Sequence, residues 1–272
     1  MAAVPATAAT STTGTGTTAT VPAIAADASP QEATVRFPLN AEVVSAGTTG
    51  FLSRTNAGTP EYRWTRYADG TSTVLPAAAS VTGGASDIVV TGDDAVSLSR
   101  FLKIYDMAVP SAAPVEVDLA ELGPDYWFAG TIGSTVIVML EKPEGGWLPH
   151  LLTVEGGSLT DRVVTGMPSS VCDLNETAYT VNTAVFDCGL GMNEVRGKVV
   201  VDLATATAVS GHVQEGDPWR LFEAAVSDTH VAWHEANGST RTIHVARHGT
   251  AERKQLEAKA YYGDDSGYSA TG

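Results

Sequence analysis

The pattern of apolar and polar positions is that of short β-strands joined by tight turns, and it is clearest in residues 226–247. Apolar side chains recur at every second position there, and an Asn-Gly pair at 237–238 separates two such runs. This combination is typical of a β-hairpin. We expect Trp233 to face the core on one strand, together with Ile243 and Val245 on the other.

The rest of the chain repeats this unit in looser form. Four further segments alternate strands and turns in the same way, and the hairpin belongs to a fifth; the segments are residues 50–75, 87–119, 126–165, 171–209 and 222–256. Self-similarity at a period of roughly 40–45 residues is typical of β-propeller blades, which bury their faces against one another. The sequence therefore predicts an all-β fold, a β-propeller of about five visible blades or part of a larger one.

Helical periodicity is missing from the sequence. Residues 251–260 contain helix-forming side chains, but they form a short and mostly polar run that is marginal as a helix. Residues 34–46 alternate well enough for one strand. That strand is expected to complete the fifth blade from outside, unless further blades follow this chain.

The composition shifts at both ends of the chain. Residues 1–33 form an Ala/Thr/Gly-rich tract without Lys or Arg, and residues 261–272 form an acidic, Gly/Ser-rich stretch. We predict a disordered N-terminal tract, a propeller domain over 34–260 and a flexible acidic tail. The N-terminal tract resembles the linker that follows a removed signal peptide, which favours a secreted protein; the alternative is a disordered tail of a cytosolic protein.

The charge balance and the length of the apolar runs exclude two roles, nucleic-acid binding and membrane insertion. The chain has 16 Lys and Arg against 31 Asp and Glu, a net charge of −15. Binding nucleic acid requires a basic surface that neutralises phosphates, so we expect no nucleic-acid partner. The sequence also contains no apolar run near the ~20 residues that span a bilayer, and we expect no membrane insertion.

Two cysteines, Cys172 and Cys188, flank a predicted strand, turn and strand. Neighbouring strands can bring such residues together, so we predict a disulfide between them. The alternative is a pair of buried thiols.

Histidines gather in the hairpin. His230, His234, His244 and His248 are expected on the face opposite Trp233, because alternate residues of a strand share a face. Three converging imidazoles could bind zinc or copper. The alternative is a polar face without a metal, and we favour this alternative, with no cofactor.

The five tryptophans are spread along the repeats. Trp127 and Trp233 lie in apolar strands, where we expect core positions. Trp147 and Trp219 lie next to Gly and Pro residues, in predicted loops, and are the candidate ligand contacts.

Catalytic motifs are missing from the sequence. It contains no G-x-S-x-G or S-x-x-K motif, no P-loop and no G-x-G-x-x-G. Scattered carboxylates such as Asp161 and Asp187 could pair for glycoside hydrolysis, although sequence spacing does not show that they meet. Asp in these contexts is first of all a turn residue.

Two segments carry a family resemblance: the hairpin VSDTHVAWHEANGSTRTIHVAR and the phrase LKIYDMAVPSAAPVEVDL. In repeat pattern the chain resembles the N-terminal propeller-like region of secreted high-GC bacterial proteins that continue into FG-GAP (VCBS-type) repeats. That family's calcium-binding Asp/Gly loops are missing, and Gly263-Asp264-Asp265 is no substitute. The resemblance implies an extracellular and non-enzymatic role.

The functional expectation is a secreted binding or scaffold module that contacts a protein or a cell-surface glycan through loops on one propeller face. The alternative is a secreted polysaccharide hydrolase with carboxylates in the central channel. A third reading is a passive substrate of cross-linking enzymes, labelled at Gln31 or Lys259.

Overall fold

The computed structural model describes residues 40–56, 58–95, 99–123, 125–141, 146–168, 171–189, 195–213, 220–237, 240–250 and 253–259. The predicted N-terminal tract 1–33 and acidic tail 261–272 lie outside these residues, so their disorder stays a prediction. The described part of the chain contains no α-helix, and a short 3-10 turn lies at Leu119–Glu121. No helix in this part is long and apolar enough to cross a membrane.

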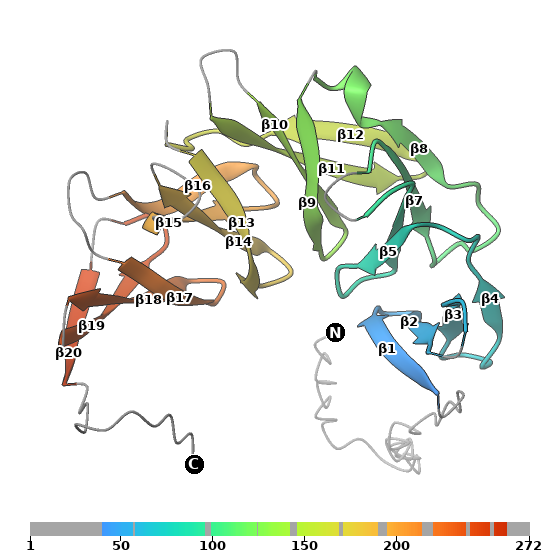
Figure 1. Ribbon diagram of the computed structural model, residues 1–272, viewed down its shortest axis with the longest axis horizontal. Coiled ribbons are helices and arrows are strands. Elements are labelled where there is room, and N and C mark those ends of the chain that lie inside the picture. The colour runs from blue at the N-terminus through green and yellow to red at the C-terminus, as the bar shows by residue number, and fades with distance from the viewer. Residues whose placement is uncertain are drawn as a thin grey trace, which may run out of the picture. The chain divides into compact units, whose positions relative to one another are not determined.

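The strands form five antiparallel sheets of four strands each, every sheet built from consecutive strands (Figure 1). The first sheet holds β1 (Ala41–Ala46), β2 (Gly50–Thr55), β3 (Tyr62–Arg66) and β4 (Ser72–Val74). The second holds β5 (Ser80–Gly83), β6 (Ile88–Gly92), β7 (Phe101–Asp106) and β8 (Val115–Asp118). The third holds β9 (Tyr126–Ile132), β10 (Thr135–Glu141), β11 (Trp147–Glu155) and β12 (Ser158–Val163). The fourth holds β13 (Val171–Tyr179), β14 (Thr183–Gly189), β15 (Val195–Asp202) and β16 (Thr207–Val213), and the fifth β17 (Arg220–Val226), β18 (His230–Asn237), β19 (Thr240–Arg247) and β20 (Arg253–Lys259).

Each sheet packs face to face on the next sheet along the chain. Four buried clusters make these contacts: one joins the first and second sheets, and the others join the second to the third, the third to the fourth and the fourth to the fifth. The first strand of each sheet also contacts the first strand of the following sheet. Consecutive four-stranded meanders stacked in this way are the blades of a β-propeller, which confirms the predicted fold class.

The apolar strands follow from this packing. A sheet between two neighbours buries both faces, so its central strands need apolar residues at successive positions. Strand β10 shows this, because Val136, Ile137, Val138 and Met139 have no exposed surface. Ile137 and Met139 face the fourth sheet, whereas Val136 and Val138 face the second.

One prediction about strand positions was wrong, and the segment described as a marginal helix forms a strand. Strand β1 pairs with β2 in the first sheet and does not complete the fifth. The short connection 47–49 explains this, because it returns the chain directly alongside β1 as a hairpin. Residues 253–259 form β20, an edge strand paired with β19. Pairing with a neighbouring strand outweighs the weak helix propensity of such a short segment.

Candidate functional site

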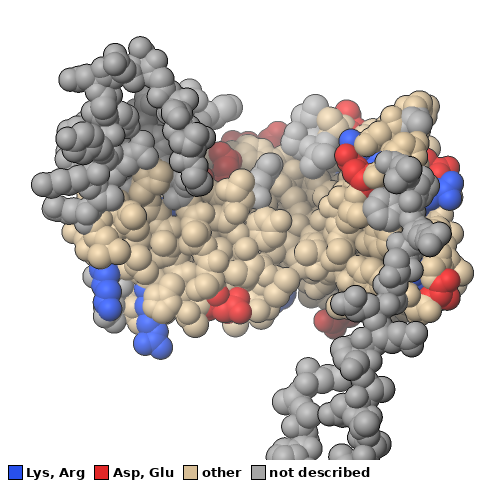
Figure 2. Space-filling view, turned by 90° about the horizontal axis from the view of Figure 1, so that it is seen from below, with Lys and Arg blue, Asp and Glu red and all other residues tan. Residues whose placement is uncertain are grey.

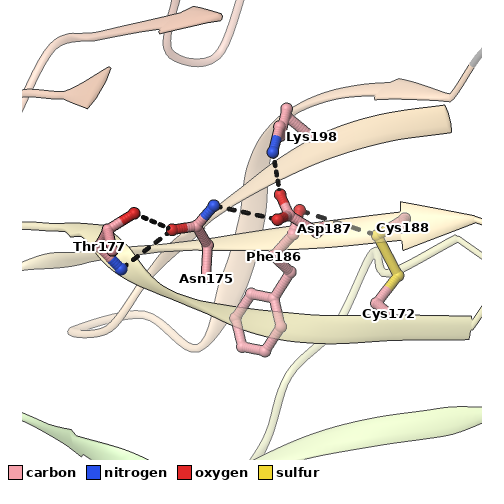
Figure 3. Close-up of polar contacts among 7 residues, drawn as sticks. All are labelled: Cys172, Asn175, Thr177, Phe186, Asp187, Cys188 and Lys198. Carbon is pink, nitrogen blue, oxygen red and sulfur yellow. Dashed lines mark hydrogen bonds and ion pairs between the residues drawn. A yellow bond between two sulfur atoms is a disulfide. The ribbon is translucent and has the colours of Figure 1, made fainter. Parts of the chain in front are cut away.

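A disulfide joins Cys172 of β13 to Cys188 of β14, as predicted (Figure 3). The two residues are direct partners in the strand register, and both are buried in the cluster between the third and fourth sheets. Disulfides form and persist in oxidising compartments. The bond therefore indicates that the protein matures in an oxidising environment.

Next to the disulfide, a row of charged residues crosses the fourth sheet. Asp173 of β13 is the partner of Asp187 on β14, which is in turn the partner of Lys198 on β15. Direct partners share a face and successive residues alternate, so this row lies on the face opposite the disulfide. That face also carries Val185 and Val200, which pack against the fifth sheet.

The Lys198 ammonium forms an ion pair with the Asp187 carboxylate (Figure 3). The Lys198 side chain is 2% exposed and that of Asp187 is 24% exposed. A cation removed from water to this extent requires a counter-ion. Asp187 therefore neutralises a charge inside the boundary between two sheets.

Asn175 adds a second donor to the Asp187 carboxylate. Its side-chain nitrogen donates to Asp187 Oδ2 at 3.0 Å. Its oxygen accepts from the backbone nitrogen of Thr177 at 3.0 Å and from the Thr177 hydroxyl at 2.8 Å. These bonds fix the amide orientation, so Asp187 is held by donors from β13 and β15.

Asp173 lies at the exposed side of the row and has a different electrostatic environment. Desolvation, and to a lesser extent the charge of Asp187, raise the pKa of the Asp173 carboxyl above its ordinary value of 3.8. Asp173 therefore carries its charge at a cost to the folded state near neutral pH. A carboxyl with a raised pKa beside an ionised one is also the arrangement found in acid–base sites.

Asp173→Asn is expected to raise the melting temperature at pH 7, because it removes a charge that the fold disfavours. When folding raises the pKa of a carboxyl, the folded protein loses stability as the pH rises from the unfolded-state pKa through the folded-state pKa. The difference in melting temperature between Asp173→Asn and the wild type should therefore shrink as the pH falls toward 3.8. Thermal melts of both proteins between pH 3 and pH 8 measure this; a difference that does not change with pH would contradict the assignment.

The aromatic candidates have different outcomes. Trp147 begins strand β11 and does not lie in a loop, contrary to the prediction. Its ring lies against Trp127 of β9, with ring centroids 4.5 Å apart and planes tilted by 36°. Both rings are half-buried and pack on the cluster that holds the disulfide. This packing explains why Trp147 belongs to the strand. Trp219 lies outside the described residues, and Trp233 is buried, as predicted.

The hairpin of the fifth sheet forms, and His230 and His234 lie opposite Trp233 as predicted, but the prediction for His244 is wrong. Trp233 is the direct partner of His244, and the two rings stack with centroids 5.3 Å apart. His230 and His234 lie on the other face, because they alternate with Trp233 along β18. A two-residue hairpin pairs odd-numbered with even-numbered positions here, so Ile243 and Val245 cannot share the face of Trp233.

This register places His244 on one face of the sheet and the other two proposed metal ligands, His230 and His234, on the opposite face. His244 is 4% exposed and lies with Trp233 on the face that packs on the fourth sheet. His230 and His234 therefore cannot join it around one ion. Within the described ranges, no group of three or more His, Cys, Asp or Glu side chains is placed to hold a metal ion.

A polar pocket of about 460 Å³ lies where the third and fourth sheets meet. It is lined by Ser134, Thr135, Thr153, Glu155, Thr160, Arg162, Val181, Asn182, Leu203 and Ala204. Thr153 and Thr160 are direct partners on β11 and β12, so their hydroxyls share a face. Arg162 donates to the carbonyl oxygens of Leu203 and Ala204, which fixes its guanidinium between the sheets.

Sequence reasoning missed Asp173, Lys198 and the pocket. A signal for the charged row was present, because each cysteine has an aspartate next to it, in Cys172-Asp173 and Asp187-Cys188. A disulfide between neighbouring strands that opposes the two cysteines must also oppose these two aspartates. The pocket had no such signal, since its residues come from five separate stretches of the chain.

Comparisons with known proteins found similar chains only among solved structures. No family model matches the chain, and no curated protein matches it. Among solved structures, the β-propeller domain of the Trilobed protease from Pyrococcus furiosus is similar, with 13% identity, a TM-score of 0.45 and coverage of 82% of this chain and 71% of that one. A post-proline cleaving enzyme from Rickettsia typhi has 9% identity, a TM-score of 0.49 and coverage of 82% and 38%. One of two prolyl endopeptidases has 12% identity, a TM-score of 0.48 and coverage of 77% and 33%. The chain therefore spans between 33% and 38% of these two peptidases.

Proposed function

We propose that the protein is an extracellular, non-enzymatic binding module that contacts a protein or a cell-surface glycan. The observation that carries this proposal is the polar pocket between the third and fourth sheets. It offers the hydroxyls of Thr153 and Thr160, the Asn182 amide, the Glu155 carboxylate and the Arg162 guanidinium to one ligand. Such a set of donors and acceptors suits a polyhydroxylated or polar partner.

The location of the pocket supports the role. Its walls include the connections between β9 and β10, β13 and β14, and β15 and β16, and binding sites are commonly built from loops on a rigid scaffold. The disulfide supports an extracellular location, since it requires an oxidising compartment. The relationship to secreted FG-GAP (VCBS-type) proteins remains part of this proposal.

The test is binding of the purified chain to an array of defined cell-surface glycans, compared with a Thr153→Val/Thr160→Val variant. Valine keeps the shape of threonine and removes the hydroxyl, so we expect the variant to lose about tenfold or more in affinity. Thr73→Val, on the exposed strand β4, is the matched control and should bind as the wild type does. Equal affinity of the double variant and the wild type would exclude this pocket.

The arrangement of Asp173 and Asp187 favours one second candidate, a polysaccharide hydrolase. The two carboxylates are direct cross-strand partners, and the raised pKa of Asp173 suits a general acid. Against it, Asp187 is held by Lys198 and Asn175. Mass spectrometry of each bound glycan after incubation separates the two functions: hydrolysis would shorten the glycan, and Asp173→Asn would abolish that reaction.

A further inference from the structure

A second pocket lies on the face of the fifth sheet that points away from the fourth sheet. It has a volume of about 430 Å³ and is lined by Thr229, His230, Val245, Arg247 and Lys254. The register explains this set, because His230 is the partner of Arg247 and Val245 is the partner of Lys254. Three adjacent strands, β18, β19 and β20, thus each place a basic side chain in one pocket.

Arg247 and Lys254 differ from six other cations that the structure describes. Each of these six forms an ion pair with a carboxylate: Arg54 with Glu42, Arg63 with Glu61, Arg66 with Asp69, Arg100 with Asp118, Lys103 with Glu116, and Lys198 with Asp187. Within the described ranges, neither Arg247 nor Lys254 has a carboxylate within ion-pair distance.

The contrast is informative because carboxylates outnumber cations in this chain, 31 to 16. Asp228 lies close by in the connection before β18, but its carboxylate accepts from the Thr180 hydroxyl at 2.9 Å. Figure 2 shows Lys or Arg side chains that project at the left, the side on which Figure 1 shows the fifth sheet. Cations that have no carboxylate partner among the described residues of an acidic protein provide a place for an anionic ligand.

The chemistry of the lining defines the ligand class. A guanidinium donates in a planar fork that matches two oxygens of one oxyanion, and an ammonium adds a point charge. The Thr229 hydroxyl lies 2.9 Å from His230 Nδ1, so these two polar groups form a hydrogen-bonded pair at the pocket wall. Ile243 and Leu256, which are 37% and 60% exposed, are cross-strand partners on the same face and add apolar surface beside the cations.

We propose that the fifth sheet binds an oxyanion group, a sulfate, phosphate or carboxylate, through Arg247, Lys254 and His230. The Ile243 and Leu256 side chains contact the uncharged part of the molecule that carries this group. The site is independent of the polar pocket between the third and fourth sheets, because the two share no residue.

The test measures binding of fluorescently labelled dextran sulfate to the full chain at low ionic strength, with neutral dextran in parallel. The Arg247→Gln/Lys254→Gln variant is expected to bind dextran sulfate at least tenfold more weakly, because it removes two charge-assisted donors. Added inorganic sulfate, inorganic phosphate or acetate should compete, and their order of potency identifies the preferred oxyanion. Binding should also weaken as salt is added.

Lys103→Gln is the matched control, since Lys103 is an exposed cation on the third strand of another sheet, paired with Glu116. It should bind as the wild type does, and Arg247→Lys, which keeps the charge, should bind more tightly than the double variant. Three results would each overturn the proposal: no binding of dextran sulfate by the wild type, equal binding of neutral dextran, or equal affinity of the double variant.

Discussion

Asp187→Asn is expected to lower the free energy of unfolding by about 3 kcal/mol, the cost of leaving a buried cation without its counter-ion. The Lys198 side chain is 2% exposed, so water cannot replace the lost carboxylate. The asparagine side chain keeps the shape of aspartate and removes only the charge. Guanidinium unfolding of both proteins at pH 7 measures the difference.

Two further variants show that the unpaired charge, and not the altered contacts, causes this loss. Asp187→Val/Lys198→Met removes both charges and is expected to recover most of the stability, because apolar residues of similar volume can replace a buried ion pair. Glu116→Gln breaks the exposed pair with Lys103 and should leave the unfolding midpoint almost unchanged. If the double variant were as unstable as Asp187→Asn alone, the unpaired charge of Lys198 would not be the cause of the loss.

Cys172→Ala/Cys188→Ala is expected to lower the free energy of unfolding by about 3 kcal/mol, the value for a disulfide that closes a loop of roughly 15 residues. The two cysteines are separated by 16 positions in the sequence. The bond restricts the unfolded chain, so its removal favours unfolding. Thermal melts of the wild type and the double variant, each with and without dithiothreitol, measure the effect.

The double variant is the control for the reductant. Dithiothreitol should lower the melting temperature of the wild type toward that of the variant and leave the variant unchanged. If the wild type melted at one temperature with and without reductant, the bond would contribute nothing to stability.

These two experiments examine opposite faces of the fourth sheet. The disulfide faces the third sheet, and the Asp187–Lys198 pair faces the fifth. Loss of either should therefore weaken a different sheet boundary. The polar pocket lies at the boundary with the third sheet, so ligand binding there is expected to depend more on the disulfide than on the ion pair.

The local parts of this structure could be predicted from the sequence. Period-two alternation identified the strands, and the spacing of the repeats identified the five sheets. The hairpin β18–β19 and the disulfide follow for the same reason. Both join neighbouring strands, so short sequence separation nearly determines which residues can meet.

Only the tertiary structure decided which face of each strand is buried. Alternation shows that Trp233 and His234 point in opposite directions, but both faces of the fifth sheet carry apolar side chains. The contact with the fourth sheet buried the face of Trp233 and His244 and left Ile243 exposed, whereas the hairpin register alone separates His244 from His230 and His234. Packing against Trp127 likewise explains why Trp147 lies in β11 and not in a loop. Period two assigns residues to two faces, and only the neighbouring sheet determines which of the two is the core.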